Sequence, residues 1–179
     1  MTRQLPETAR LILRRITTAD WPAIHRYMSD PEVTRWLPKG VLDEAQSRAF
    51  AERNAGPRPR AIAIIERRSG EFIGHLDFHP WLGPGNQEIG WAIAAPWQGR
   101  GYATEAALAL RDFAFQKRRI HRLVATCQPE NTASWRVMEK LGMRREAHFR
   151  QHLHRGPGLW WDEYFYALLA EEYFAEKAG

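Results

Sequence analysis

The six residues from Gln98 to Ala103, with the sequence Gln-Gly-Arg-Gly-Tyr-Ala, form the segment of this chain with the clearest chemical signature. The segment follows an apolar run and precedes a long amphipathic stretch, which predicts a glycine-rich turn leading into a helix. Glycines let the backbone approach a ligand closely, and the first turn of a helix presents unpaired N–H groups and a positive dipole end. The sequence therefore predicts a binding site for a pyrophosphate group.

Two common nucleotide-binding motifs do not fit this segment. The dinucleotide pattern G-x-G-x-x-G begins at Gly99 and Gly101, but Thr104 stands where the third glycine is required. That pattern also needs an acidic residue about 20 positions later, where this chain has the basic run Lys117-Arg118-Arg119. The nucleotide P-loop is excluded as well, because no Gly-Lys-Ser/Thr follows a glycine at the required spacing.

The remaining pattern, Gln-x-x-Gly-x-Ala, resembles the acetyl-CoA loop of the GNAT N-acetyltransferases. Other segments match the superfamily in the expected order over about residues 8–170. They are the opening strand at 8–14, the central strands at 72–74 and 88–91, and a second cofactor segment at 131–134 and 137–143. This second cofactor segment has the form typical of RimJ/RimL-type ribosomal-protein N-terminal acetyltransferases.

The resemblance implies an α/β (α+β) GNAT fold: a central, mixed, mostly antiparallel twisted sheet of about seven strands with flanking helices. It also implies a splayed V between the fourth and fifth strands. The residue patterns predict strands at 10–15, 61–66, 71–78, 87–94, 121–126, 144–153 and 161–169. They predict helices ending near residue 28, restarting at 31, and running over 43–54, 103–114 and 132–141, the last ended by Gly142.

By the same resemblance, the cofactor is acetyl-CoA, released as coenzyme A. In the family, the strand containing Gly90 bulges and splays, and its free backbone groups pair with the pantetheine arm. Glycine in a strand often marks a bulge or a close backbone approach, although simple packing also explains it. A backbone N–H here could stabilise the thioester oxygen as charge develops. The expected cofactor-binding residues are Trp91, Ala92, Ile93, Gln98, Gly99, Arg100, Gly101, Tyr102, Ala103, Thr104, Asn131 and Ser134.

Acetyl transfer to an amine requires a neutral nucleophile, so a proton must leave an α-amine of pKa about 7.7–8.0 or a lysine of pKa about 10.4. Glu88 matches the position where many GNAT enzymes carry a general base. The alternatives are His75, Asp77 and His79 on the adjacent strand, desolvation with water alone, or an ordinary exposed role for Glu88.

The leaving thiolate benefits from a hydroxyl donor, and the motif match assigns that role to Ser134. Ser134 could instead satisfy its own helical turn, and Asn131 could serve only as a helix cap. The single Cys127 reads as a core thiol outside any nucleophile setting, which favours direct transfer over an acyl-enzyme.

Eight tryptophans are a high count for this length, and four of them, Trp36, Trp81, Trp160 and Trp161, lie near segments expected to wall the acceptor groove. Each taken singly is also compatible with packing. The expected substrate-binding residues are Trp36, His79, Trp81 and Trp160. Asp162 and Glu163 on the last strand could attract a cationic amine.

The length and the 44% hydrophobic content predict a single domain over residues 1–179, which the resemblance implies is an N-acetyltransferase domain. One cysteine, the absence of metal-ligand spacing and the absence of an apolar span predict a cytoplasmic protein with no disulfide, metal or membrane anchor. The formal charge of +5 favours polyanionic partners, but no sequence-specific nucleic-acid motif is present. Lys117-Arg118-Arg119 also fits a helix C-terminus, where cations complement the dipole.

The leading functional interpretation is direct, acetyl-CoA-dependent transfer to a primary amine acceptor. The favoured acceptor is a protein N-terminal α-amine, such as that of a ribosomal protein. One alternative is a small-molecule acceptor such as a polyamine, an aminoglycoside or an amino-acid analogue. A second alternative is an acyl-CoA-binding module without turnover, although such a module would have no chemical need for Glu88 and Ser134. A monomer and a homodimer are both compatible with the sequence.

Overall fold

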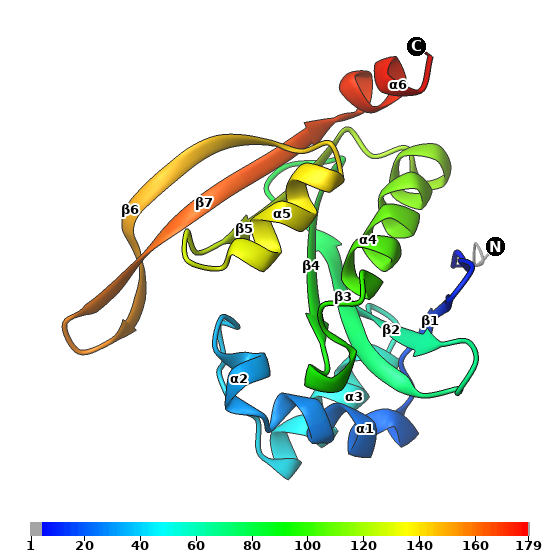
Figure 1. Cartoon of the computed structure of the whole chain (residues 1–179), viewed down its shortest axis with the longest axis vertical. Coiled ribbons are helices and arrows are strands. Elements are labelled where there is room, and N and C mark those ends of the chain that lie inside the picture. Colours follow the sequence, from blue (N-terminus) through cyan, green and yellow to red (C-terminus); the bar gives the residue numbers. More distant parts are fainter. Residues whose placement is uncertain (1–4, 179) are drawn as a thin grey trace.

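The computed structural model describes residues 5–178 and is built around one twisted, seven-stranded sheet (Figure 1). The strand order is β1-β2-β3-β4-β5-β7-β6, and the β4–β5 pair is parallel while the other pairs are antiparallel. The strands are β1 (Leu11–Arg15), β2 (Ala61–Glu66), β3 (Phe72–Pro80), β4 (Asn86–Ile93), β5 (Arg122–Cys127), β6 (Arg144–Gly156) and β7 (Leu159–Leu169).

Helices lie on both faces of this sheet. The helical elements are η1 (Thr18–Asp20), α1 (Trp21–Met28), α2 (Pro31–Thr34), α3 (Glu44–Ala55), η2 (Ala95–Trp97), α4 (Tyr102–Phe113), η3 (Ala114–Arg118), α5 (Thr132–Lys140) and α6 (Ala170–Ala178). Strand β2 is buried along its whole length because both of its faces are covered. Its Ile62 and Ile64 join the core with α4, whereas Ala61, Ala63 and Ile65 join the core with α1 and α3.

The middle of the sheet opens between β4 and β5. These strands pair only at Asn86–Arg122, Gln87–Leu123 and Glu88–Val124, and then diverge toward the end of β4. Figure 1 shows α4 and α5 beside this divergence, with α1, α2 and α3 near the end of β4 that leads into the loop before α4. The seven-stranded mixed sheet and the V between the fourth and fifth strands are therefore confirmed.

Several details differ from the sequence expectations. Strands β6 and β7 form a longer hairpin than expected, reaching Gly156 and Leu159. The chain also ends in α6, which the residue pattern did not reveal, and its Tyr173 is fully buried against Phe115 with ring centroids 4.7 Å apart. A long-range contact between aromatic rings thus fixes the last helix.

The glycine in a close backbone approach is Gly74 of β3 rather than Gly90 of β4. The β3–β4 register runs through Gly90 without a shift, whereas the β2–β3 register shifts between Ile64 and Ile65. A Cβ atom on Gly74 would overlap the Ala92 carbonyl oxygen, while one on Gly90 would make ordinary contacts. Glycine is required where β3 crosses closest to β4.

The cap after α5 follows the prediction, because Gly142 has φ +77° and the Met143 N–H donates to the Met138 carbonyl. Within residues 5–178, no helix has the length and apolar character needed to cross a membrane.

Candidate active site

The glycine-rich loop joins the end of β4 to the start of α4. Gly99 and Gly101 adopt φ values of +73° and +81°, the left-handed region that glycine enters without strain. The Gln98 Nε2 donates to the Ile93 carbonyl at 2.8 Å and so fastens the loop to β4. The Glu105 N–H donates to the Gly101 carbonyl at 3.0 Å and opens the helix, leaving the preceding N–H groups at its N-terminus.

A residue from the far end of the chain holds this loop. Arg10 donates from Nε to Glu105 at 2.6 Å and from Nη1 to the Arg100 carbonyl at 3.1 Å, and its guanidinium lies 4.4 Å from the Tyr102 ring centroid. Thr8 also donates to Glu105, at 2.6 Å. Burial acts to raise the pKa of Glu105, but the hydrogen bonds from Thr8 and Arg10 outweigh it and lower that pKa. Sequence reasoning missed this clamp, because no local pattern links residues 95 positions apart.

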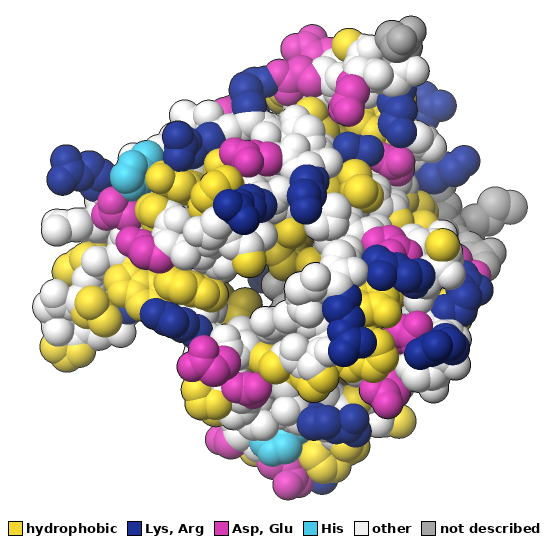
Figure 2. Space-filling view, in the orientation of Figure 1, with side chains coloured by type: hydrophobic (Ala, Val, Ile, Leu, Met, Phe, Trp, Pro, Cys, Tyr) yellow, Lys and Arg dark blue, Asp and Glu magenta, His cyan; other side chains and the backbone are white. Residues whose placement is uncertain are grey.

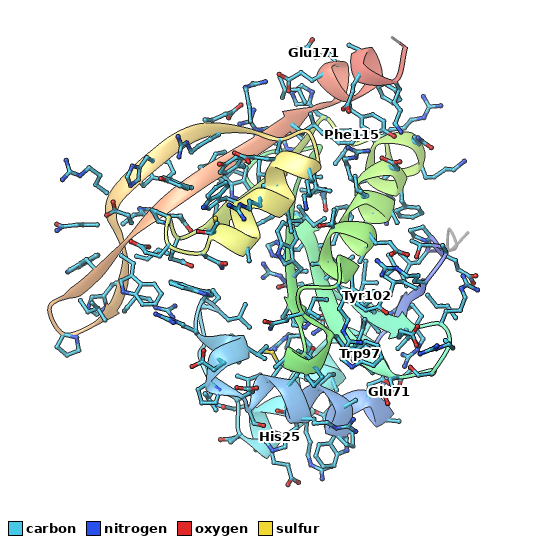
Figure 3. All side chains as sticks on the ribbon, in the orientation of Figure 1. His25, Glu71, Trp97, Tyr102, Phe115 and Glu171 are labelled. Carbon is cyan, nitrogen blue, oxygen red and sulfur yellow. The ribbon has the colours of Figure 1, made fainter. Side chains whose placement is uncertain are left out.

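Aromatic rings support the same loop. Figure 3 shows Trp97 and Tyr102 together at the start of α4, and their ring centroids are 5.7 Å apart. The Arg100 guanidinium lies 5.3 Å from the Trp97 ring centroid. A cleft of about 460 Å³ lies beside it, between α1 and the end of β4, and Tyr27, Arg26 and Arg100 help to line it.

The loop and the V fit the two parts of coenzyme A. A Cβ atom on Gly99 would meet open space, so the backbone at that point is accessible to a ligand. The loop N–H groups, the helix dipole and the Arg100 cation suit a pyrophosphate. The edge of β4 that diverges from β5 offers backbone groups to an extended arm. Ala92 and Ile93 of this edge are buried, and Trp91 is half-buried on the α4 side.

The sheet register gathers titratable groups on the face opposite α4. Asp77 pairs with Gly90, and His79 pairs with Glu88, so these side chains share one face of β3 and β4. On the far side of the V, Glu163 of β7 is on the same face. Glu88 pairs with Val124, Val124 pairs with Ala167, and Glu163 lies four residues before Ala167 on the same face of β7. Asp162 and Glu163 of β7 were both expected to attract a cationic amine, but only Glu163 lies on this face, which we call the groove face. Asp162 points to the other face of the sheet and binds His148 at 2.6 Å.

Glu88 is the carboxylate whose environment suits a general base. Burial raises its pKa, and the negative charges of Asp77 and Glu163 act in the same direction, while His79 and Arg60 oppose them. The His79 Nε2 lies 3.7 Å from a Glu88 carboxylate oxygen. A carboxylate with a raised pKa takes up a proton more readily near neutral pH than an ordinary glutamate does.

Ser134 lies in the first turn of α5, beside the V. Its N–H donates to the Asn131 side chain at 3.2 Å, so Asn131 does cap the helix. The Ser134 hydroxyl is within hydrogen-bonding reach of the Cys127 thiol. Burial raises the pKa of Cys127 to about 12, with Glu163 adding to the effect and Ser134 opposing it. The thiol is therefore protonated and poorly nucleophilic at neutral pH.

The proposed aromatic wall is partly as expected. Trp36 lies 5.5 Å from Trp161, and Trp81 lies 5.2 Å from Phe165, measured between ring centroids. Trp160 is half exposed and packs on His154, on the face of β7 opposite Trp161 and Glu163. Trp160, predicted to wall the acceptor groove, therefore points away from the face that carries Trp161, because successive strand residues point to opposite faces.

The β6–β7 hairpin contacts the segment after α2 through Arg155, near the tip of the hairpin. Arg155 donates to the carbonyls of Leu37 at 3.1 Å and Arg35 at 3.3 Å, and its guanidinium lies 4.4 Å from the Trp161 ring centroid. Figure 2 shows the surface hollowed between the hairpin and the lobe of α1 and α2. The contacts of Arg155 thus join the hairpin to that lobe beside the hollow.

Known acetyltransferases are similar to this chain in sequence and in structure. Residues 10–144 match the model of the acetyltransferase (GNAT) domain. The chain is 42% identical over 166 residues to the uncharacterized N-acetyltransferase YnaD of Bacillus subtilis, covering 93% of this chain and 97% of that protein. A GNAT-family acetyltransferase from Bacillus anthracis has a crystal structure with a TM-score of 0.89 at 42% identity, covering 93% of this chain and 98% of that one.

Two more distant relatives have named acceptors. The ribosomal protein uS5-alanine N-acetyltransferase of Escherichia coli is 29% identical over 85 residues, covering 48% of this chain and 43% of that protein. Spermidine N-acetyltransferase from Vibrio cholerae, solved in complex with CoA and spermine, has a TM-score of 0.80 at 17% identity, covering 93% and 99%. At that identity, the second likeness shows a shared fold alone.

Proposed function

The chain belongs to the GNAT acetyltransferase family and is an N-acetyltransferase, and we propose that it transfers acetyl from acetyl-CoA directly to a protein N-terminal α-amine. The observation that carries this proposal is the position of Glu88. Glu88 is the last residue of β4 that pairs with β5, and its side chain lies on the face of the sheet opposite α4.

The residues of the loop and of the V would hold the donor. The N–H groups between Gly99 and Thr104 and the Arg100 cation would bind the pyrophosphate, and Trp91, Ala92 and Ile93 would flank the pantetheine arm. Asn131 and Ser134 close the same side from α5. Bound acetyl-CoA supplies an acetyl thioester, whose carbonyl carbon is the electrophile.

An α-ammonium loses one proton before it attacks and a second proton as the amide forms, while the sulfur gains one, so one proton is released to solvent overall. Glu88 accepts the amine proton, directly or through a water, as the new N–C bond forms and the C–S bond breaks. The departing thiolate takes a hydrogen bond from the Ser134 hydroxyl and acquires a proton from solvent, so charge and atoms balance. Cys127 takes no part, since its raised pKa keeps the thiol protonated.

The basicity of the acceptor favours an α-amine. An α-ammonium has a pKa about 2.5 units below that of a lysine, which makes its deprotonation cheaper by about 3 kcal/mol. A carboxylate base such as Glu88, even with a raised pKa, is better matched to the weaker amine. The uS5-alanine acetyltransferase among the distant relatives is consistent with this acceptor.

A second candidate acceptor is a small polycationic amine. Asp77, Glu88 and Glu163 face one groove, and three carboxylates would attract an acceptor with more than one positive charge. The V. cholerae spermidine acetyltransferase shares the fold.

Thiol release from acetyl-CoA tests both candidates. The purified protein would be assayed with alanine- and serine-initiated peptides, the same peptides with blocked N-termini, lysine peptides, spermidine and an aminoglycoside, with a no-acceptor control. We expect turnover on free N-termini and none on blocked ones. Turnover on spermidine alone would move the acceptor to small polyamines. Silence with every amine, despite tight CoA binding by calorimetry, would overturn the proposed transfer to amines.

A further inference from the structure

The carboxylate of Asp77 lies on the same face of the sheet as Glu88, and the proposed general-base role of Glu88 gives it no function. Asp77 stands opposite Gly90 in the β3–β4 pairing, and its side chain is 38% exposed. A Cβ atom on Gly90 would lie 3.5 Å from both the Cβ and a carboxylate oxygen of Asp77. Glycine at position 90 therefore leaves the carboxylate open to the groove.

The buried side chains of His75 and Tyr27 lie on the core side of the Asp77 carboxylate. The Nε2 of His75, a residue only 2% exposed, lies 3.6 Å from an Asp77 carboxylate oxygen. The other ring nitrogen, Nδ1, is 2.6 Å from the hydroxyl of the buried Tyr27. If Tyr27 donates to Nδ1, the imidazole carries its proton on Nε2 and directs it at Asp77. Phe50 packs on the His75 ring with centroids 5.1 Å apart, which fixes the ring.

The charges around the two carboxylates divide them into different roles. His75, His79 and Arg60 face Asp77 and lower its pKa, outweighing the opposing effect of burial. Glu88 faces His79, Asp77, Glu163 and Arg60, and burial raises its pKa. A pair of carboxyl groups with opposite shifts supplies one group that stays ionised and one that takes up protons.

We propose that Asp77, positioned by His75 and Tyr27, binds the ammonium group of the acceptor and holds it beside Glu88. The inference rests on the proposed function, since it names the contact made by the amine in that same site. Asp77 stays ionised throughout, and the amine proton passes to Glu88. Tyr27 and His75 are positioning residues that act through Asp77.

The test measures acceptor binding apart from turnover. An alanine-initiated peptide and, separately, spermidine would be titrated calorimetrically into the CoA-saturated protein. The variants are Asp77→Asn and the control Asp162→Asn, whose carboxylate lies on the outer face of β7 and binds His148. Loss of a charge-assisted hydrogen bond predicts that Asp77→Asn weakens amine binding by about 10-fold to 100-fold. CoA affinity should be unchanged in both variants, which also verifies folding.

Two further variants separate positioning from structure. Gly90→Ala keeps the charge but places a methyl group over the carboxylate, so amine binding should weaken while CoA binding is retained. Tyr27→Phe removes the hydrogen bond to His75, and amine affinity should fall by about threefold to 10-fold, again without a change for CoA. An equal loss of amine and CoA affinity in Tyr27→Phe would instead mean a structural role, against the proposal.

The outcomes are distinct from those of the proposed function. If the wild-type protein acetylates amines and Asp77→Asn binds them with unchanged affinity, the proposed binding of the ammonium group by Asp77 is overturned. The proposed acetyl transfer would still stand. If Asp77→Asn instead keeps its amine affinity but loses most of its kcat, Asp77 would be the general base. That result would also overturn the proposed binding of the ammonium group by Asp77. If wild-type protein acetylates no amine, the proposed function itself has failed.

Discussion

Gly74 and Ala92 approach so closely across the β3–β4 pair that a Cβ atom on Gly74 would overlap the Ala92 carbonyl oxygen. Gly74 also has φ +158°, at the border of the region that favours glycine. The contact sets the course of β4 where Ala92 and Ile93 border the V. A single absent side chain on β3 therefore shapes the proposed pantetheine edge on β4.

Gly74→Ala should disturb both stability and cofactor binding. Overpacking in a close-packed sheet costs about 1–3 kcal/mol of unfolding free energy, and β4 must shift to relieve the overlap. Denaturant unfolding and CoA calorimetry measure the two effects. Gly90→Ala, on the same strand pair with ordinary contacts at its Cβ, is the matched control for stability. Equal stability of the two variants would contradict the close approach.

Glu88→Gln should lower kcat by about 100-fold or more, the contribution typical of a general base, and leave CoA affinity unchanged. The base works only when deprotonated, so the wild-type rate should fall as pH drops through the raised pKa of Glu88. This acidic limb of the pH–rate profile should be absent in Glu88→Gln, whose profile should follow only the ionisation of the acceptor amine. Glu52→Gln, an exposed change on α3, is the control. Identical pH profiles for wild type and Glu88→Gln would remove Glu88 from the base role.

Gly101→Val should abolish cofactor binding. A β-branched residue is strained at φ +81°, and the added side chain would meet the Arg10 guanidinium that clamps the loop. Displacing the loop N–H groups proposed to bind the pyrophosphate should weaken CoA binding by about 100-fold or more. Gly158→Val carries a similar strain at φ +72° in the β6–β7 turn, with nothing near its Cβ. Calorimetry with CoA should separate the variants, and tight binding by Gly101→Val would mean that the pyrophosphate lies elsewhere.

Cys127→Ala should keep kcat within a factor of about two, because a thiol with a pKa of about 12 is almost entirely protonated at neutral pH. Mass spectrometry of the wild-type protein incubated with acetyl-CoA and no acceptor should show no acetylated Cys127. Slow alkylation by iodoacetamide in the folded state is the accompanying expectation. A covalent acetyl adduct on Cys127 that is consumed when amine is added would refute direct transfer.

Arg155→Ala should loosen the contact between the hairpin and the segment after α2. The variant loses hydrogen bonds to the Leu37 and Arg35 carbonyls and the stacking on Trp161, so the acceptor KM should rise by about 10-fold. The KM for acetyl-CoA should stay the same, because the loop before α4 is untouched. Arg150→Ala, an exposed change on the same strand, serves as the control. Steady-state kinetics with each substrate varied in turn would check this split, and a parallel rise in both KM values would argue against a role confined to the acceptor.

Much of the fold, including the glycine-rich loop before α4, could be predicted from the sequence. The glycine loop, the amphipathic α4, the cap at Asn131 and the stop at Gly142 depend on residues within a few positions of one another. Such patterns respond to backbone sterics and to the periodicity of side chains, which are local properties. Glu88 could be placed at a strand start because the motif around Gly90 is contiguous.

The arrangement of side chains around Glu88 was decided by tertiary structure. Strand register put Asp77, Glu88 and Glu163 on one face, and it turned Trp161 inward and Trp160 outward. A shift of one residue in pairing would reverse every one of these assignments, and pairing between distant strands leaves no local trace in the sequence. The clamp from Arg10 to Glu105 spans 95 residues for the same reason. Sequence by itself determined the helices, the strands and the glycine-rich loop, whereas long-range packing decided which side chains meet around Glu88.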